Sequence, residues 1–192
     1  MTNWHCIDHP KLAKGLTAYF NYVDGVPTRK RGRVKCNRFI AHNKDLDFAL
    51  IKCLPKIFLK RIPPVTIDAR PFNVINGYDG TNRNLKNKKD RPMYIIHQQC
   101  FGRGCMAYKV FQIDRIRETG AKDAKHEADT LAGTSGAPIF DLESNHLIAL
   151  HHEGNPALNQ AIPMYKIIKR FKYLSKKNKT YKRLLEDLKY LD

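Results

Sequence analysis

The sequence predicts an all-β fold made of two β halves, followed by a basic helical tail. Short apolar runs rich in β-branched and aromatic residues recur between turn-forming residues, and each run is short enough to be a strand. This rhythm is typical of a β-sandwich or a β-barrel. The predicted strands are Leu16 to Val23, Arg33 to Ile40, Phe48 to Leu54, Val65 to Ala69, Phe72 to Ile75, Tyr94 to Gln98, Ala107 to Ile113, Pro138 to Phe140 and Leu147 to His151.

Two stretches interrupt this rhythm. KIFLKRIPP, which ends at Pro64, indicates a connector between the halves, and GYDGTNRNLKNKKDRP indicates a long, turn-rich loop. We therefore expect four regions along the chain. They are an N-terminal β half at residues 1–54, a connector at 55–64, a C-terminal β half at 65–163 and a basic helical tail at 164–192.

The last of these regions has helical spacing. Its apolar side chains recur at helical intervals in a background of lysine and arginine. We expect a helix that packs on the domain through its apolar face and keeps a cationic face in water, and a dedicated nucleic-acid or lipid surface is the alternative. The apolar positions are Tyr165, Ile168, Phe171, Leu174, Leu184, Leu185 and Leu188.

Length and composition indicate a folded, cationic protein. The chain has 192 residues, of which 42% are hydrophobic, so it can supply a core. Lysine and arginine number 35 against 18 aspartates and glutamates, which gives a formal net charge of +17. This charge favours acidic partners such as nucleic acid, an anionic membrane surface or an acidic protein. No apolar run approaches the roughly 20 residues of a membrane span.

The five cysteines do not suggest a secreted disulfide framework. Their number is odd, Cys6, Cys36 and Cys53 are widely scattered, and no apolar signal stretch precedes them, so we expect no signal peptide and the cytoplasm or another reducing compartment. Cys100 and Cys105 flank FGRG, but no second Cys/His pair lies at metal-ligand spacing. We expect a turn with two buried thiols there, no metal and no cofactor. Whether Cys6 and Cys36 pair with each other stays open.

One stretch carries candidate chemistry. GTSGAPIF places Ser135 in a glycine-flanked turn that leads directly into a strand. A serine hydroxyl is a poor nucleophile at neutral pH, so it needs a base within reach, a carboxylate that orients the base, and backbone N–H donors for the oxyanion. His5 in TNWHC and Asp47 in DLDFALIK are the candidate base and carboxylate. The amides of Gly133 and Ser135 are the candidate donors.

The order and spacing of these residues favour a catalytic triad. The intervals from His5 to Asp47 and from Asp47 to Ser135 come within a few residues of the roughly 45 and 93 residues of the His, Asp, Ser template. Asp45 competes with Asp47, but Asp47 directly precedes the apolar run FALI. Taken singly, His5 could be a surface residue, Asp47 a turn cap and Ser135 part of a structural turn. The histidines without such a context are interpreted as surface or core residues, namely His9, His42, His97, His126 and His146.

These motifs resemble those of trypsin-like serine peptidases of the chymotrypsin fold, in the branch of the glutamyl endopeptidases. TNWHC resembles the histidine motif of that family, DFALIK its aspartate motif, and DTLAGTSGAPIFDLESNHLIALHHEG its serine motif with the following pocket strand. The resemblance implies two β-barrels of the six-stranded type and hydrolysis of peptide bonds through an acyl-enzyme. It also implies His5 as general base, Asp47 as its orienter, Ser135 as nucleophile, and Gly133 with Ser135 as the oxyanion hole.

The same resemblance suggests the preferred substrate. In the glutamyl-selective branch, a threonine before the nucleophile and a histidine on the pocket strand bind an acidic P1 side chain, and the matching positions here are Thr130 and His151. An imidazole can donate to a carboxylate, and the basic surface would attract an acidic polypeptide. Glu153 would oppose an acidic P1 side chain at the pocket mouth. The alternative is that His151 only completes a core strand, with His152 on the opposite side of the pleat.

The start of the chain departs from the family pattern. The family places further β-strands ahead of its histidine, whereas this sequence begins four residues before His5. We therefore expect a fragment, a misplaced start or an incomplete first barrel, with His5 near a frayed terminus where it is difficult to hold against Ser135. Two other functions follow as alternatives. One is a catalytically impaired, protease-like binding module, and the other is a nucleic-acid-binding protein, which only the charge supports.

Overall fold

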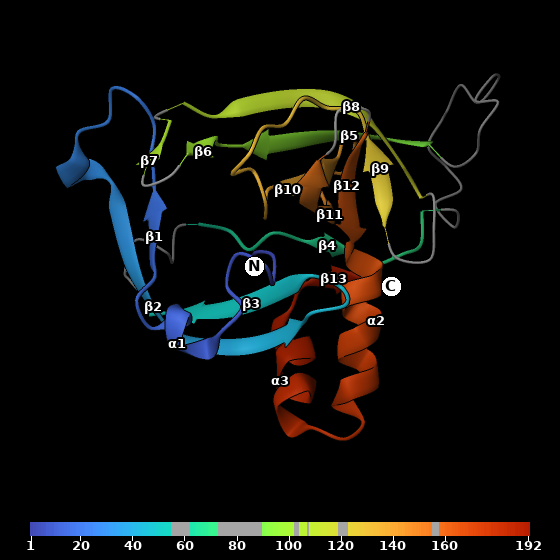
Figure 1. Cartoon of the computed structure of the whole chain (residues 1–192). Helices are drawn as coiled ribbons and strands as arrows, with labels where there is room; N and C mark the ends of the chain where they lie inside the picture. The colour runs from blue at the N-terminus through green and yellow to red at the C-terminus, as the bar shows by residue number, and fades with distance from the viewer. Residues whose placement is uncertain (55–61, 73–89, 102–103, 107, 119–122, 155–157) are drawn as a thin grey trace.

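The computed structural model describes residues 1–54, 62–72, 90–101, 104–106, 108–118, 123–154 and 158–192. Over these residues the protein is mostly β, with a closed six-stranded barrel, a three-stranded sheet and a short C-terminal helical region (Figure 1). Most of the predicted connector at 55–64 and most of the loop GYDGTNRNLKNKKDRP lie outside the described residues, as does the predicted strand Phe72 to Ile75 beyond Phe72.

The barrel is built from the second half of the chain. Its strands follow one another in the order β10 (Pro138–Asp141), β5 (Asp90–His97), β8 (Val110–Glu118), β9 (Ala124–His126), β12 (Asn159–Pro163) and β11 (Leu147–Gly154). The barrel closes because β11 also pairs with β10, and all six pairings are antiparallel. Side chains alternate along each strand, so Met93 and Ile95 of β5 and Ile116 of β8 are fully buried inside.

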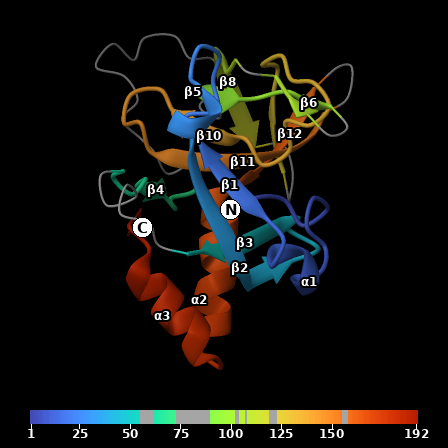
Figure 2. The same cartoon turned by 90° about the vertical axis from the view of Figure 1, so that its left-hand side faces the viewer.

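The first half of the chain forms a sheet of three strands. These are β1 (Thr17–Phe20), β2 (Gly32–Asn43) and β3 (Phe48–Cys53), with the short helix α1 (Pro10–Ala13) before them and the 3₁₀ turn η1 (Thr28–Lys30) between β1 and β2. Thr2 pairs with Ala49 of β3 through two backbone hydrogen bonds of 2.9 and 2.7 Å. The N-terminal residues therefore lie between this sheet and the barrel, as Figures 1 and 2 show.

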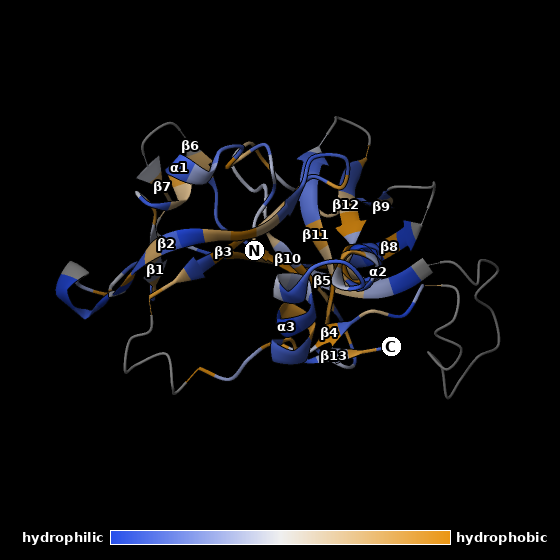
Figure 3. Cartoon of the chain, turned by 90° about the horizontal axis from the view of Figure 1, so that it is seen from below, coloured by the Kyte–Doolittle hydropathy of each residue, from blue (hydrophilic) through white to orange (hydrophobic). Residues whose placement is uncertain are grey.

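Two helices follow the last barrel strand. Helix α2 (Met164–Ser175) buries Met164, Ile167, Ile168 and Phe171, and the ring of Phe171 packs edge-on against Phe48 of β3. Helix α3 (Lys179–Asp187) begins at the Asn178 N-cap and keeps its apolar residues only half-buried. Both ribbons mix hydrophobic and hydrophilic residues in Figure 3, as amphipathic helices do. No helix in the described part of the chain is long and apolar enough to cross a membrane.

The chain ends on a strand that the sequence did not predict. β13 (Tyr190–Leu191) pairs in parallel with β4 (Ile67–Asp68), and β4 pairs in parallel with β11 of the barrel. A second apolar core, separate from the barrel interior, contains Phe48, Ile167 and Phe171. Four partly buried side chains pack against it, namely Leu184, Leu185, Leu188 and Tyr190. The helical region is therefore attached to the barrel through backbone hydrogen bonds as well as through apolar packing.

The expectation of two buried thiols in a turn at Cys100 and Cys105 is wrong. These cysteines lie directly opposite each other in the small hairpin β6 (Cys100–Phe101) and β7 (Gly104–Cys105), and they form a disulfide. Cys36 and Cys53 are likewise opposite each other in β2 and β3 and form a second disulfide. Cross-strand register brings both pairs together, which scattered positions in the sequence do not reveal. Cys6 is free and exposed, so it does not pair with Cys36.

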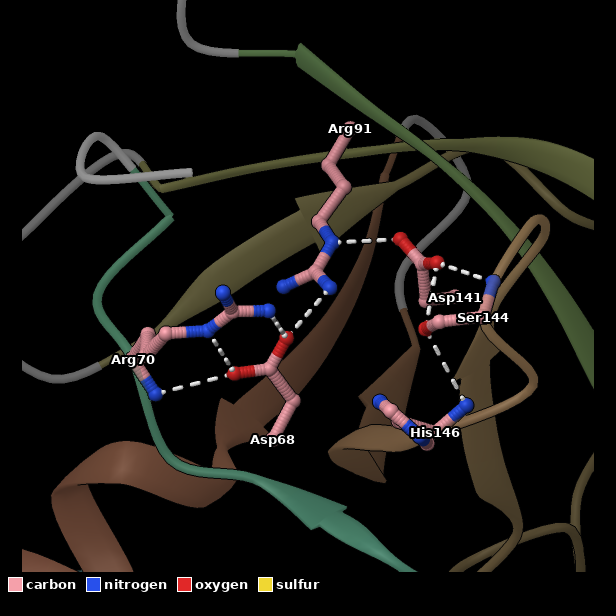
Figure 4. Close-up of polar contacts among 6 residues, drawn as sticks. All are labelled: Asp68, Arg70, Arg91, Asp141, Ser144 and His146. Atoms are coloured by element: carbon pink, nitrogen blue, oxygen red, sulfur yellow. Dashed lines mark hydrogen bonds and ion pairs between the residues drawn. The ribbon is translucent and has the colours of Figure 1, made fainter. Parts of the chain in front are cut away.

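A buried ionic cluster joins β4 to the barrel (Figure 4). The Arg91 guanidinium donates to Asp141 at 2.6 Å and to Asp68 at 2.7 Å, and Arg70 donates to both oxygens of Asp68 at 2.9 Å. Ser144 donates to Asp141 from its backbone and its hydroxyl. Burial alone would raise the pKa of Asp68, but the hydrogen bonds from Arg70 and Arg91 outweigh it and lower that pKa from 3.8 to about 2.

We expect this cluster to make the stability of the protein sensitive to acid. Because the folded-state pKa of Asp68 lies below its unfolded value, its contribution is complete above pH 3.8 and is lost as the pH falls toward about 2. A shift of this size corresponds to about 2 kcal/mol in the free energy of unfolding. Denaturant titrations should therefore show Asp68→Asn to be less stable than the parent at pH 6 and to lose less stability on acidification. Asp8→Asn, at an exposed position, is the control. If the free energy of unfolding of Asp68→Asn and of the parent changed equally with pH, Asp68 would not be the source of the acid sensitivity.

Candidate active site

Ser135 lies in a tight turn that two glycines make possible. Gly133 and Gly136 have φ values of 88° and 87°, in the left-handed region that favours glycine. A Cβ atom on Gly133 would overlap the backbone of Cys100, and one on Gly136 would lie 2.6 Å from Thr2 Oγ1. The turn is thus packed between the β6–β7 hairpin and the N-terminal residues. Both glycines of GTSG are required by this backbone.

The structure brings His5, Asp47 and Ser135 together. His5 Nδ1 lies 2.7 Å from Asp47 Oδ2, and His5 Nε2 lies 3.0 Å from Ser135 Oγ. The backbone N–H of His5 donates to Asp47 Oδ1 at 2.9 Å. Because the carboxylate accepts from Nδ1–H, the tautomer that follows leaves a lone pair on Nε2 facing the serine hydroxyl. That is the arrangement a base needs in order to take the proton of Ser135.

Asp47 is held in an uncommon backbone conformation. Its φ is 42°, a region that residues other than glycine seldom adopt and that aspartate tolerates better than most. Its N–H donates to Lys44 O at 3.1 Å, and its carbonyl accepts from the side chain of Asn3 at 3.0 Å. The turn between β2 and β3 therefore presents the carboxylate to His5 at the cost of local strain.

The structure does not show the frayed His5 that the short N-terminus led us to expect. Thr2 is hydrogen-bonded to β3, the buried side chain of Asn3 is bonded to Asp47, and Ile7 is buried. These contacts fix the residues on both sides of His5, whose own side chain is 48% exposed. Contacts of the N-terminal residues with the three-stranded sheet therefore hold the backbone of His5 in place.

The backbone N–H groups of the turn that holds Ser135 fall into two sets. The N–H groups of Thr134, Gly136 and Ala137 donate to carbonyls of the turn and of β11. Within the described residues, the N–H groups of Gly133 and Ser135 make no such hydrogen bond. These are the two N–H groups that the sequence analysis named as candidate donors to an oxyanion.

A hollow of 510 Å³ opens beside Ser135. The predicted residues Thr130 and His151 line it, together with Glu153, Gly154 and Asn159. The Thr130 hydroxyl donates to Asn159 Oδ1 at 2.8 Å, and Asn159 Nδ2 donates to Ala128 O at 2.7 Å. Asn159 fixes the orientation of Thr130, and the sequence analysis missed it because nothing in NQAIP marks a pocket residue.

His151 is also part of a buried group of histidines. Its Nδ1 lies 3.2 Å from Nε2 of His126, and His97 is buried close by. Burial lowers the pKa of His151 to about 3, with repulsion from neighbouring histidines adding to it, and burial lowers the pKa of His126 to about 4. Both imidazoles are therefore neutral near pH 7. If His126 Nε2–H donates to His151 Nδ1, the proton of His151 is on Nε2.

Comparisons with known proteins leave the family of this chain open. No protein-family profile matches it, and no curated protein matches it. Among solved structures, one match comes from work on the coupled folding and binding of the intrinsically disordered Sesbania mosaic virus VPg protein, with 15% identity and a TM-score of 0.44. The match covers 70% of this chain and 62% of the chain in the solved structure. A likeness this distant carries no conclusion about the function of this chain.

Proposed function

We propose that this chain is a serine endopeptidase of the trypsin-like type, with the chymotrypsin fold that its motifs resemble. The observation that carries the proposal is the unbroken path from Ser135 Oγ through His5 to Asp47, with contacts of 3.0 and 2.7 Å. A structural turn would need neither a histidine base aligned on the hydroxyl nor a carboxylate aligned on the histidine. The two free amides of the turn add a site for the oxyanion.

The reaction follows from these positions. Ser135 Oγ attacks the carbonyl carbon of the substrate while His5 Nε2 takes its proton, and the amides of Gly133 and Ser135 donate to the oxygen that becomes negative. His5 then gives the proton to the leaving amine as the C–N bond breaks, which leaves an acyl group on Ser135. Water attacks this ester with His5 again as base, and the acid product and the free serine are released. Asp47 stays ionised throughout and stabilises the imidazolium.

A fluorophosphonate tests the proposal because it reacts covalently with an activated serine. We expect the intact mass to rise by one adduct for the parent chain and to stay unchanged for Ser135→Ala. Ser144→Ala, which changes a serine of the ionic cluster, should label as the parent does. Folded parent protein that takes up no adduct would overturn the proposal.

We further propose that the enzyme prefers an acidic residue at P1. The support is the neutral imidazole of His151 in the pocket and the net charge of +17, while the Thr130 hydroxyl already donates to Asn159 Oδ1. His151 Nε2–H can donate to a carboxylate oxygen without a change of protonation. Cleavage of a peptide library mainly after Lys, Arg or aromatic residues would overturn this preference.

Glu153 gives this preference a sharper test. Its exposed carboxylate lines the same hollow and repels a negative P1 side chain. We expect Glu153→Gln to raise kcat/KM roughly twofold to fivefold for a peptide with Glu at P1, as expected for a solvent-exposed charge pair. The matched peptide with Gln at P1 has the same shape and no charge, so its kcat/KM should not change. Equal gains on both peptides would show that Glu153 acts through packing rather than charge.

A further inference from the structure

The outer face of the barrel carries apolar side chains that the proposed mechanism does not use. On β8 and the residue before it, every second position is exposed, in the order Lys109, Phe111, Ile113 and Arg115. Phe111 is 56% exposed and Ile113 is 61% exposed, whereas Ile116 of the same strand is fully buried inside the barrel. Figure 1 shows β8 and β5 side by side at the top of the barrel, on the side opposite to α2 and α3.

Three aromatic rings form a row across this face. Phe140 of β10 lies directly opposite Tyr94 of β5, and their rings stack with centroids 5.1 Å apart and planes inclined by 20°. Phe111 of β8 continues the row, because its ring centroid lies 5.2 Å from that of Tyr94 and its plane is inclined by 32°. The Tyr94 hydroxyl donates to Asn145 Oδ1 at 3.0 Å and so fixes the middle ring. The row is thus ordered by contacts within the protein.

Packing within the sheet explains only part of this row. Cross-strand aromatic pairs stabilise a sheet, and Tyr94 and Phe140 are half-buried, as expected for such a pair. Phe111 lies at the end of the row and is mostly exposed. β9 pairs with β8 only from Ile116 to Glu118, so in the described part of the chain no strand flanks Phe111 on its far side. Adjoining exposed apolar side chains of this kind are typical of a binding surface.

Cations flank the apolar positions at both ends. Lys109 and Arg115 are exposed, and a rise of about 3.4 Å per residue places them about 20 Å apart along the strand. The chain as a whole has a net charge of +17. A ligand that matches this surface combines flat rings with negative charge along an extended chain. Each nucleotide of a single strand supplies a base and a phosphate, whereas an acidic peptide carries rings only at some residues and a phospholipid headgroup carries none.

We propose that the outer face of β8 and β5 binds single-stranded nucleic acid. One base stacks on the ring of Phe111 at the open end of the row, the next base packs against Ile113, and Lys109 and Arg115 donate to backbone phosphates. In the sequence, only the charge supported nucleic-acid binding, and the row of rings is a second, independent observation. Because every base has a face that can stack, we expect little sequence preference. This activity does not rest on the proposed peptidase function.

Substitution of the terminal ring tests the stacking contact. The probe is a labelled single-stranded oligonucleotide of mixed sequence and about 12 nucleotides, and fluorescence anisotropy gives its Kd. All variants are made in Ser135→Ala protein, so the result is independent of any peptidase activity. We expect Phe111→Leu, which stays apolar but loses the ring, to raise Kd at least about fivefold, as for loss of one stacked base. Phe111→Trp should bind as tightly as the parent or more tightly.

Tyr173→Leu is the matched control for the lost ring. Tyr173 of α2 is 57% exposed and the guanidinium of Arg170 lies 5.5 Å from its ring centroid, so it is an exposed ring beside a cation in the basic helical region. We expect its Kd to equal that of the parent. If Tyr173→Leu weakens binding as much as Phe111→Leu does, or if Phe111→Leu binds as the parent does, the outer face of the barrel is not the site and the proposal is overturned.

Salt dependence tests the phosphate contacts. Arg115→Gln should reduce the slope of log K against log salt concentration by about 0.7, as for one phosphate contact on a single strand. Arg183→Gln, at an exposed position of α3, should leave the slope unchanged. A parent protein that does not bind the oligonucleotide overturns the proposal. In that case, binding of a tyrosine-containing acidic peptide or of phosphatidylserine vesicles that Phe111→Leu weakens would assign the face to that partner instead.

Discussion

Replacing Asp47 by asparagine is expected to lower kcat on a peptide substrate about 10⁴-fold at neutral pH. The carboxylate accepts from His5 Nδ1–H and so keeps the lone pair of Nε2 toward Ser135 at 3.0 Å. An amide in the same place can donate to Nδ1 instead. The proton of His5 would then be on Nε2, where the imidazole can no longer take the proton of the serine.

Asp45→Asn is the matched control for this substitution. Asp45 lies in the same turn two residues earlier, but its side chain is exposed and makes no contact with the triad among the described hydrogen bonds. We expect it to keep the activity of the parent. Steady-state kinetics on one peptide give kcat for the parent and both variants, and circular dichroism verifies that each variant is folded. A fall of less than tenfold for Asp47→Asn would mean that Asp47 does not set the tautomer of His5.

His5, Asp47 and Ser135 could be selected from the sequence because the chemistry of the proposed triad constrains residue types and their order. Ser135 between two glycines, a histidine upstream and an aspartate before an apolar strand form a pattern that few chance combinations satisfy. The residues that hold the triad in place could not be predicted in this way. Asn3 donates to the carbonyl of Asp47 across 44 residues of chain, and Thr2 and Ile7 hold the residues on either side of His5.

The fold was predictable to a similar depth. Runs of apolar residues mark the longer strands, and amphipathic spacing marks α2, because burial imposes a period on several consecutive residues. Strands of two or three residues, such as β9 and β13, are too short to show a period. The disulfides were missed for another reason. The number and spacing of the cysteines were used to predict the redox compartment, whereas disulfide pairing depends on which residues face each other across two strands. The compartment itself stays a prediction.

Replacing Gly133 by alanine is expected to lower kcat at least about 100-fold and to destabilise the protein. Gly133 has a φ of 88°, and a Cβ atom there would overlap the carbonyl of Cys100. The turn must move to relieve this overlap, and the N–H of Gly133 moves with it. Loss of one oxyanion donor alone costs about 10² to 10³ in kcat, and the strained backbone costs about 1 to 3 kcal/mol in the free energy of unfolding.

Gly25→Ala separates the two causes. Gly25 has a φ of 73°, so alanine is strained there too, but a Cβ atom at Gly25 would meet no heavy atom within 4 Å. It lies in an exposed turn of the N-terminal half and lines neither of the hollows that Ser135 borders. We therefore expect Gly25→Ala to lose stability without losing kcat, whereas Gly133→Ala loses both. If Gly133→Ala instead resembles Gly25→Ala, the turn can shift without harming catalysis, and the amide of Gly133 is not part of the oxyanion hole.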